Sequence, residues 1–275
     1  DAKISVFDSG YLVGDGIWEA VRLSKGTLIF IDDHLSRLWN AAKATGIQLP
    51  FTKQELRDIV HSVLKINNMI DGVHVRIMVT RGIKKTPSQD PRLTISGPNL
   101  VIIPEYKLAD LKSKTKGIKL FTSTIRRGSP DYLDPKLNCH SKLHEVQALI
   151  QAIEAGADEA LMLDVNGFVS TCNSTNFFMI KDGVVYTSTG QYCMNGITRQ
   201  KVIEICAKNK IPCHQKNFSL YDTYGADEAF VTGTFGGLTP VTKIDGKMIE
   251  NQNDLSLRGN LDRLYEELIA NESKP

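Results

Sequence analysis

The sequence predicts a mixed α/β (α+β) fold divided into two domains. Two observations support this: short apolar strands alternate with amphipathic helices, and a polar, lysine-rich stretch, Lys107–Lys116, interrupts them. A chain of 275 residues is long enough for two modest domains. We therefore expect one domain at residues 1–108 and a second at residues 117–275.

The first domain is expected to begin with strands and then alternate helices with strands. Periodicity and turn residues predict strands at Lys3–Asp8, Ile17–Leu23, Thr27–Ile31, Val73–Thr80 and Asn99–Ile103. Apolar residues at helical spacing predict a helix over His34–Thr45. Thr52 followed by Glu55 has the spacing of a capping box, which predicts the start of a second helix that ends near Ile66.

The second domain is expected to contain more strands than helices. The predicted strands are Ile118–Ser123, Glu159–Asp164, Phe168–Thr171, Asn176–Ile180 and Val184–Thr187. The predicted helices are Ser141–Ala155, Thr198–Lys208 and Ser256–Ala270. This mixture favours mixed sheets over a helical bundle.

The overall composition indicates a protein that acts on small molecules. A formal charge of +2 without a dense basic run gives no electrostatic reason to expect nucleic acid or a membrane surface as partner. The cysteines are five in number and scattered, which is typical of reduced thiols in a cytoplasmic protein. No apolar run approaches the roughly 20 residues that cross a bilayer. The chain begins at Asp1, which leaves a removed leader open.

Four motifs in a fixed order carry a family resemblance. They are FDSGYLVGDGIWEAVR at Phe7–Arg22, HLSRL at His34–Leu38, NGITR at Asn195–Arg199 and TGTFGGLTPV at Thr232–Val241. Together the motifs resemble fold-type IV pyridoxal-phosphate enzymes, the group of branched-chain and D-amino-acid aminotransferases and aminodeoxychorismate lyase. The resemblance covers nearly the whole chain. It implies a small N-terminal domain, a larger C-terminal domain, pyridoxal 5'-phosphate as cofactor, and a homodimer.

The residues Gly196, Ile197 and Thr198 are candidates for binding the cofactor phosphate. They stand where a turn opens into a helix, so their amides are available to an anion. The resemblance adds the hydroxyl of Thr234 and the guanidinium of Arg37. Taken singly, these residues also fit simpler roles, namely a helix cap, a strand-end hydroxyl and a solvated helix face.

The resemblance places Asn138 where related enzymes carry the lysine that reacts with the cofactor. An amide cannot do that chemistry. Residues four apart on a helix share one face about 6 Å apart along the axis, which makes Lys142 the predicted catalytic residue. Lys136 is the second choice. The alternative is that both are surface lysines.

Thr171 aligns with the glutamate that contacts the pyridine nitrogen in related aminotransferases. A hydroxyl can form a hydrogen bond with this nitrogen, but it supplies no negative charge. We therefore expect slower transamination or a different outcome such as elimination. Glu159 and Asp164, on a neighbouring predicted strand, are possible substitutes.

Substrate binding is assigned to one strand and one turn. The strand Val73–Thr80 presents Arg76 on the same face as His74 and Thr80, whereas Arg81 lies on the other face. The resemblance connects both arginines with binding of the substrate α-carboxylate. Tyr11, near the turns at Gly10 and Gly14, is a candidate for lining the pocket, and a packing role fits it equally well.

The leading functional hypothesis is a pyridoxal-phosphate-dependent aminotransferase for a small or branched-chain amino acid and a 2-oxo acid. The alternatives are a lyase of the aminodeoxychorismate type, or a cofactor-binding pseudoenzyme because of Asn138. His140 and His144 have a metal-compatible spacing but no third ligand, so no metal is expected. The glycine clusters match neither a dinucleotide motif nor a P-loop.

Overall fold

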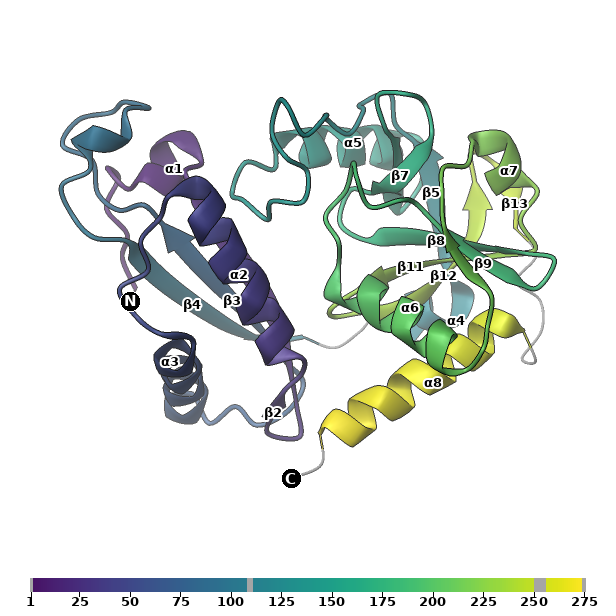
Figure 1. The fold of residues 1–275 in the computed structure, drawn as a ribbon, viewed down its shortest axis with the longest axis horizontal. Helices are drawn as coiled ribbons and strands as arrows, with labels where there is room; N and C mark the ends of the chain where they lie inside the picture. Colours follow the sequence, from purple (N-terminus) through teal and green to yellow (C-terminus); the bar gives the residue numbers. More distant parts are fainter. Residues whose placement is uncertain (1, 108–110, 250–255, 274–275) are drawn as a thin grey trace. The chain divides into compact units, whose positions relative to one another are not determined.

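The computed structural model describes residues 2–107, 111–249 and 256–273 (Figure 1). The chain packs as two compact units. The first unit consists of Asp1–Leu108, Leu137–Lys142 and Glu272–Pro275, and the second of Ala109–Lys136 and Leu143–Asn271. The segment Leu137–Lys142, which the sequence analysis assigned to the C-terminal domain, thus packs with the first unit.

The first unit is built on a four-stranded antiparallel sheet in the order β2-β1-β3-β4. Its strands are β1 (Gly16–Ser24), β2 (Thr27–Leu28), β3 (Val73–Thr80) and β4 (Asn99–Tyr106). Alternate residues of β3 enter the core, namely Val73, Val75, Ile77 and Val79. The residues between them, including His74, Arg76 and Thr80, face the other side of the sheet, as the sequence predicts.

Two amphipathic helices contribute their apolar faces to the same core. They are α2 (Ile31–Thr45), which buries Leu35 and Leu38, and α3 (Lys53–Ile66). The predicted capping box at the start of α3 is confirmed, because Thr52 Oγ1 accepts from the Glu55 amide and the Glu55 carboxylate accepts from the Thr52 amide. A short 3-10 helix, η1 (Pro91–Leu93), precedes β4.

In the first unit one strand prediction is wrong and another is too long. Lys3–Asp8 forms no strand beyond an isolated bridge at Asp8, and the helix α1 (Ser9–Val13) follows it. The Asp8 side chain accepts from the Gly10 amide and thereby caps this helix, a local bond that competes with strand pairing. The predicted strand Thr27–Ile31 shortens to β2, because Ile31 already begins α2.

The second unit is built on a nine-stranded mixed sheet in the order β10-β9-β8-β11-β12-β5-β6-β7, with β13 paired to β12. The strands are β5 (Ile118–Thr122), β6 (Glu159–Leu163), β7 (Val169–Cys172), β8 (Asn176–Lys181), β9 (Val184–Thr187), β10 (Cys213–Gln215), β11 (Glu228–Gly233), β12 (Gly237–Ile244) and β13 (Lys247–Met248). The predicted mixed α/β architecture is confirmed.

The helices of the second unit are α4 (Leu111–Lys116), α5 (Leu143–Glu154), α6 (Ile197–Lys208), α7 (Leu220–Tyr224) and α8 (Leu257–Glu272) (Figure 1). The stretch expected to be a connector, Lys107–Lys116, therefore contains a helix, while its residues 108–110 lie outside the described part of the chain. The helix expected from Ser141 begins only at Leu143. In the described ranges no helix combines the length and the apolar character needed to span a bilayer.

Candidate active site

The first turn of α6 offers backbone donors to an anion. Gly196 is the N-cap residue, with φ −62° and ψ 143°, and makes no side-chain capping bond because it has no side chain. The amides of Ile197 and Thr198 have no carbonyl one turn earlier in the helix to accept from them. Both residues are buried, at 5% and 3% exposure. Amides at the positive end of a helix dipole suit a phosphate group.

The side chain of Asn176 holds the chain in front of α6. Its Oδ1 accepts from the Gly196 amide at 3.1 Å, and its Nδ2 donates to Met194 O at 2.9 Å. A Cβ on Gly196 would lie 2.3 Å from Asn176 Oδ1, so this close approach requires glycine. Asn176 is not predictable from the sequence, because an asparagine at the start of a strand carries no local signal for a contact with a segment 20 residues away.

Tyr265 of α8 lies between the start of α6 and the turn that joins β11 to β12. Its hydroxyl oxygen is 3.5 Å from Thr198 Oγ1, and its ring would lie 3.2 Å from a Cβ on Gly237. The predicted phosphate contact Thr234 is half-buried in this turn. The second unit therefore connects the two predicted phosphate-binding segments through Tyr265, which the sequence analysis also missed.

Thr171 is buried on β7, and its hydroxyl is already bonded within the unit. Its Oγ1 donates to Thr175 O at 2.7 Å and accepts from Asn176 Nδ2 at 3.2 Å. A hydroxyl has one proton to donate. In this arrangement Thr171 cannot also donate to a pyridine nitrogen, and it brings no charge.

The two carboxylates considered as substitutes for Thr171 have local partners of their own. Glu159 accepts from Thr175 Oγ1 at 2.7 Å, and burial raises the pKa of Glu159. Asp164 accepts from the amides of Asn166 and Phe168 and closes a turn. In the sheet, the residue opposite Thr171 is Met162.

Arg37 is located in the first unit and forms a bidentate pair with Glu19. Its Nε and Nη2 lie 2.7 and 2.8 Å from the two carboxylate oxygens, and His34 Nδ1 lies 2.8 Å from the same group. Glu19 is only 1% exposed. Burial alone would raise the pKa of Glu19, but hydrogen bonds and charge from Arg37 and His34 lower it below its ordinary value.

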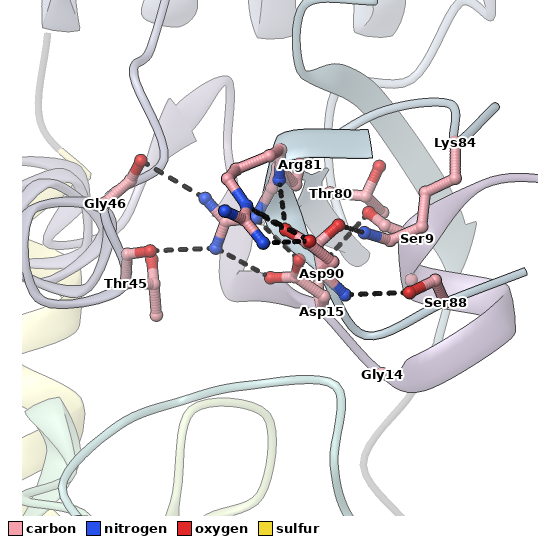
Figure 2. Close-up of polar contacts among 12 residues, drawn as sticks. Ser9, Gly14, Asp15, Thr45, Gly46, Thr80, Arg81, Lys84, Ser88 and Asp90 are labelled. Atoms are coloured by element: carbon pink, nitrogen blue, oxygen red, sulfur yellow. Dashed lines mark hydrogen bonds and ion pairs between the residues drawn. The ribbon is translucent and has the colours of Figure 1, made fainter. Parts of the chain in front are cut away.

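Arg81 is likewise engaged within the first unit (Figure 2). Its Nε and Nη2 donate to the Asp15 carboxylate at 2.6 and 3.0 Å. The same guanidinium donates to the carbonyls of Thr45 and Gly46 at 2.8 and 3.3 Å, which end α2. Arg81 therefore has a structural role, because it caps the C-terminal end of α2.

Arg76 has a different environment from Arg81. Its guanidinium carbon lies 4.3 Å from the centre of the Trp18 ring, a cation–π contact on the side of the sheet opposite the core. Tyr11, the other predicted substrate contact, is 75% exposed on α1.

The segment that carries Asn138 runs along β1 and does not form a helix. Trp18 N donates to Asn138 O at 3.0 Å, Asn138 Nδ2 donates to Trp18 O at 2.7 Å, and Cys139 forms a bridge with Ile17. Asn138 is 3% exposed. Its side chain is therefore part of the packing of the first unit.

The helical argument for Lys142 is wrong, since α5 begins at Leu143 and residues 138–142 make no helical turn. Lys142 is half-buried and packs with the first unit, whereas Lys136 is exposed and belongs to the second. A third lysine, Lys84, is 1% exposed, and its Nζ donates to Asp90 O at 3.0 Å (Figure 2).

The two histidines considered for metal binding have unrelated surroundings. His140 N donates to Gly16 O in the first unit, and His144 Nε2 lies 3.0 Å from Arg127 Nη1 in the second. Across residues 2–107, 111–249 and 256–273, no group of three or more His, Cys, Asp or Glu side chains could hold a metal ion.

Comparison with known proteins extends over the whole chain. The family model for amino-transferase class IV matches residues 16–244. The branched-chain-amino-acid aminotransferase-like protein 2 of Arabidopsis thaliana is 37% identical over 274 residues, which are 100% of this chain and 49% of the relative. The chain thus spans about half the length of that plant protein. A putative branched-chain-amino-acid aminotransferase of Methanocaldococcus jannaschii is 38% identical over 92% of this chain and 86% of its own.

A solved structure shows the same fold. It is the T.th. branched-chain amino acid aminotransferase complexed with N-(5'-phosphopyridoxyl)-L-glutamate. The similarity has a TM-score of 0.89 at 26% identity and covers 100% of this chain and 91% of the other. With the family model matching most of its length, this chain belongs to the amino-transferase class IV family.

Proposed function

We propose that the chain is a pyridoxal 5'-phosphate-dependent aminotransferase that transfers an amino group between a small or branched-chain amino acid and a 2-oxo acid. The observation that carries this proposal is the geometry at the start of α6. The buried residues Ile197 and Thr198 form its first turn, and the N-cap residue Gly196 has no side chain that could bind their amides. Membership in the class IV family and the phosphopyridoxyl ligand of a solved relative support the choice of cofactor.

The proposed roles divide between binding and proton transfer. The amides of Ile197 and Thr198, with the Thr234 hydroxyl, hold the phosphate. Arg76 binds the substrate carboxylate in preference to Arg81, because the hydrogen bonds of Arg81 are directed to Asp15 and to the end of α2. The bound cofactor supplies a reactive carbonyl and an electron-withdrawing ring. Lys142 Nζ accepts and returns the proton of the substrate Cα. Lys136 is the second choice for this role.

A second candidate function is cofactor binding without amine chemistry. It is favoured by Asn138, which stands at the position where related enzymes are expected to carry lysine. Asn138 is buried, and its side chain is hydrogen-bonded to the Trp18 carbonyl. The lyase alternative draws on Thr171, which contributes no negative charge to the site. Each alternative predicts a product pattern that differs from transamination.

We also propose that the protein forms a homodimer. The support is a row of exposed apolar side chains on α5, spaced at helical intervals: Leu143 (70% exposed), Val146 (50%), Ile150 (49%) and Ile153 (62%). An exposed apolar face of this kind is typical of a surface that a partner covers.

The test combines a spectrum with peptide mapping. Purified protein is mixed with pyridoxal 5'-phosphate, and its visible absorption is followed on adding L- and D-amino acids and then 2-oxo acids. We expect a band that bleaches with the amino acid and returns with the oxo acid, and, after borohydride reduction, a phosphopyridoxyl label on Lys142. Ammonia release supports the lyase, whereas binding with no labelled lysine supports the pseudoenzyme.

A further inference from the structure

We infer that Asn176 is the positioning residue of the proposed phosphate site, and that it sets the place of the α6 amides relative to the turn between β11 and β12. This inference rests on the proposed function and extends it to a side chain that acts through the Gly196 amide.

The side chain of Asn176 is held by chemically unambiguous partners. Gly196 N can only donate, and Met194 O can only accept, so the two bonds at 3.1 and 2.9 Å fix which end of the amide is oxygen. Asn176 Nδ2 also reaches Thr171 Oγ1 at 3.2 Å and Cys193 Sγ at 3.8 Å. Asn176 is 5% exposed, so water does not replace these partners readily.

The backbone of the same residue is anchored to the other predicted phosphate contact. Asn176 is the first residue of β8 and pairs with Thr232 of β11, two residues before Thr234. Thr232 Oγ1 donates to Asn176 O at 3.5 Å. One residue therefore connects the strand that leads into the Thr234 turn with the N-cap of α6.

Gly196 provides an independent constraint on this geometry. Its φ of −62° is allowed for any residue, so alanine there causes no backbone strain. An added Cβ would instead lie 2.3 Å from Asn176 Oδ1. The next atoms are the Asn176 Cγ at 3.5 Å and Arg199 Cβ at 3.8 Å, which are ordinary contacts. The conflict caused by Gly196→Ala is thus specific to the Asn176 side chain.

The inference predicts an effect on phosphate binding that goes beyond stability. Asn176→Ala frees the Gly196 segment, so the amides of Ile197 and Thr198 no longer meet the phosphate together. We expect the Kd for pyridoxal 5'-phosphate to rise about 10- to 100-fold, the range for lost hydrogen bonds to a charged group. The Kd for pyridoxal, which lacks the phosphate, should stay unchanged.

The experiment is a double-mutant cycle read by calorimetric titration with both ligands. Gly196→Ala should weaken binding of pyridoxal 5'-phosphate as much as Asn176→Ala does. In the Asn176→Ala background the same glycine change should have an effect of no more than about twofold, because the conflicting oxygen is gone. Asn173→Ala is the matched control, since Asn173 Oδ1 accepts from the Ala160 amide at 2.8 Å in the same unit.

The possible outcomes separate the two proposals. If wild-type protein binds neither pyridoxal 5'-phosphate nor inorganic phosphate, the proposed function fails and the inference falls with it. If wild type binds but Asn176→Ala binds equally well, or loses pyridoxal and its phosphate ester in the same proportion, only the inference is wrong. If Asn176→Ala does not fold, the inference is tested with Gly196→Ala alone. An unchanged ratio between the Kd for pyridoxal and the Kd for pyridoxal 5'-phosphate in that variant overturns the role of Asn176.

Discussion

Arg37 and Arg81 of the first unit are paired with carboxylates, whereas the start of α6 in the second unit has backbone donors and an N-cap without a side chain. Arg37 is bonded to Glu19 and Arg81 to Asp15, at distances of 2.6–3.0 Å. At α6, the amides of Ile197 and Thr198 begin the helix behind Gly196. Both regions carry motifs of the same family, yet these two guanidiniums bind carboxylates of the first unit, whereas the N-cap of α6 makes no side-chain capping bond.

The difference shows that a charged residue in a family motif is weak evidence for ligand binding until its counter-charge is known. A buried carboxylate such as Glu19 requires positive partners, and the guanidinium that satisfies it loses donors it could offer to phosphate. Backbone amides at a helix start have no such competitor, because helix geometry leaves them unpaired. The contrast is open to test by removing the carboxylates.

The largest effect is expected for Glu19→Ala. The change leaves Arg37 and His34 without their shared carboxylate, and breaking a buried pair in this way costs about 3–5 kcal/mol of unfolding free energy. Urea unfolding measures it. Glu105→Ala on β4, where the side chain is exposed, is the control and should change stability by less than about 0.5 kcal/mol. A loss for Glu19→Ala as small as that of the control would break the comparison.

The stability of the protein as a function of pH is expected to report the ionisation of Glu19 in its pair with Arg37. The folded-state pKa of Glu19 is lowered from its ordinary value of 4.5, so its stabilising contribution is present above that pH and is lost as pH falls through the lower folded value. We expect the stability difference between wild type and Glu19→Gln to shrink below pH 4.5. A difference that grows on acidification would mean that the carboxyl group is not stabilised as an anion.

The smallest effect is expected for Arg81→Ala. Arg81 and Asp15 are about one-fifth exposed, so losing this pair and the cap on α2 should cost about 1–2 kcal/mol. Asp15→Asn should cost a similar amount, and the double variant less than the sum. In the proposed enzyme, KM for the amino acid should rise with Arg76→Ala and stay constant with Arg81→Ala. The opposite result would return the carboxylate-binding role to Arg81.

Local patterns predicted most elements where one signal dominated. The capping box at Thr52 and Glu55, the alternation in Val73–Thr80 and the turn into α6 each depend on neighbours within a few residues. The prediction for Lys3–Asp8 failed because a capping bond from Asp8 outweighed an alternating pattern. The helical argument for Lys142 failed because α5 starts at Leu143, two residues after the predicted start at Ser141.

From the sequence alone followed the mixed α/β class, the family and the residues that begin α6, because periodicity, turn residues and motif order are properties of the chain itself. Only the tertiary structure showed that Glu19 binds Arg37 and that Asp15 binds Arg81. It also showed that Asn138 is hydrogen-bonded to Trp18 and Asn176 to Gly196. Each of these contacts joins residues at least 18 positions apart, and no local pattern specifies which distant donor and acceptor will meet.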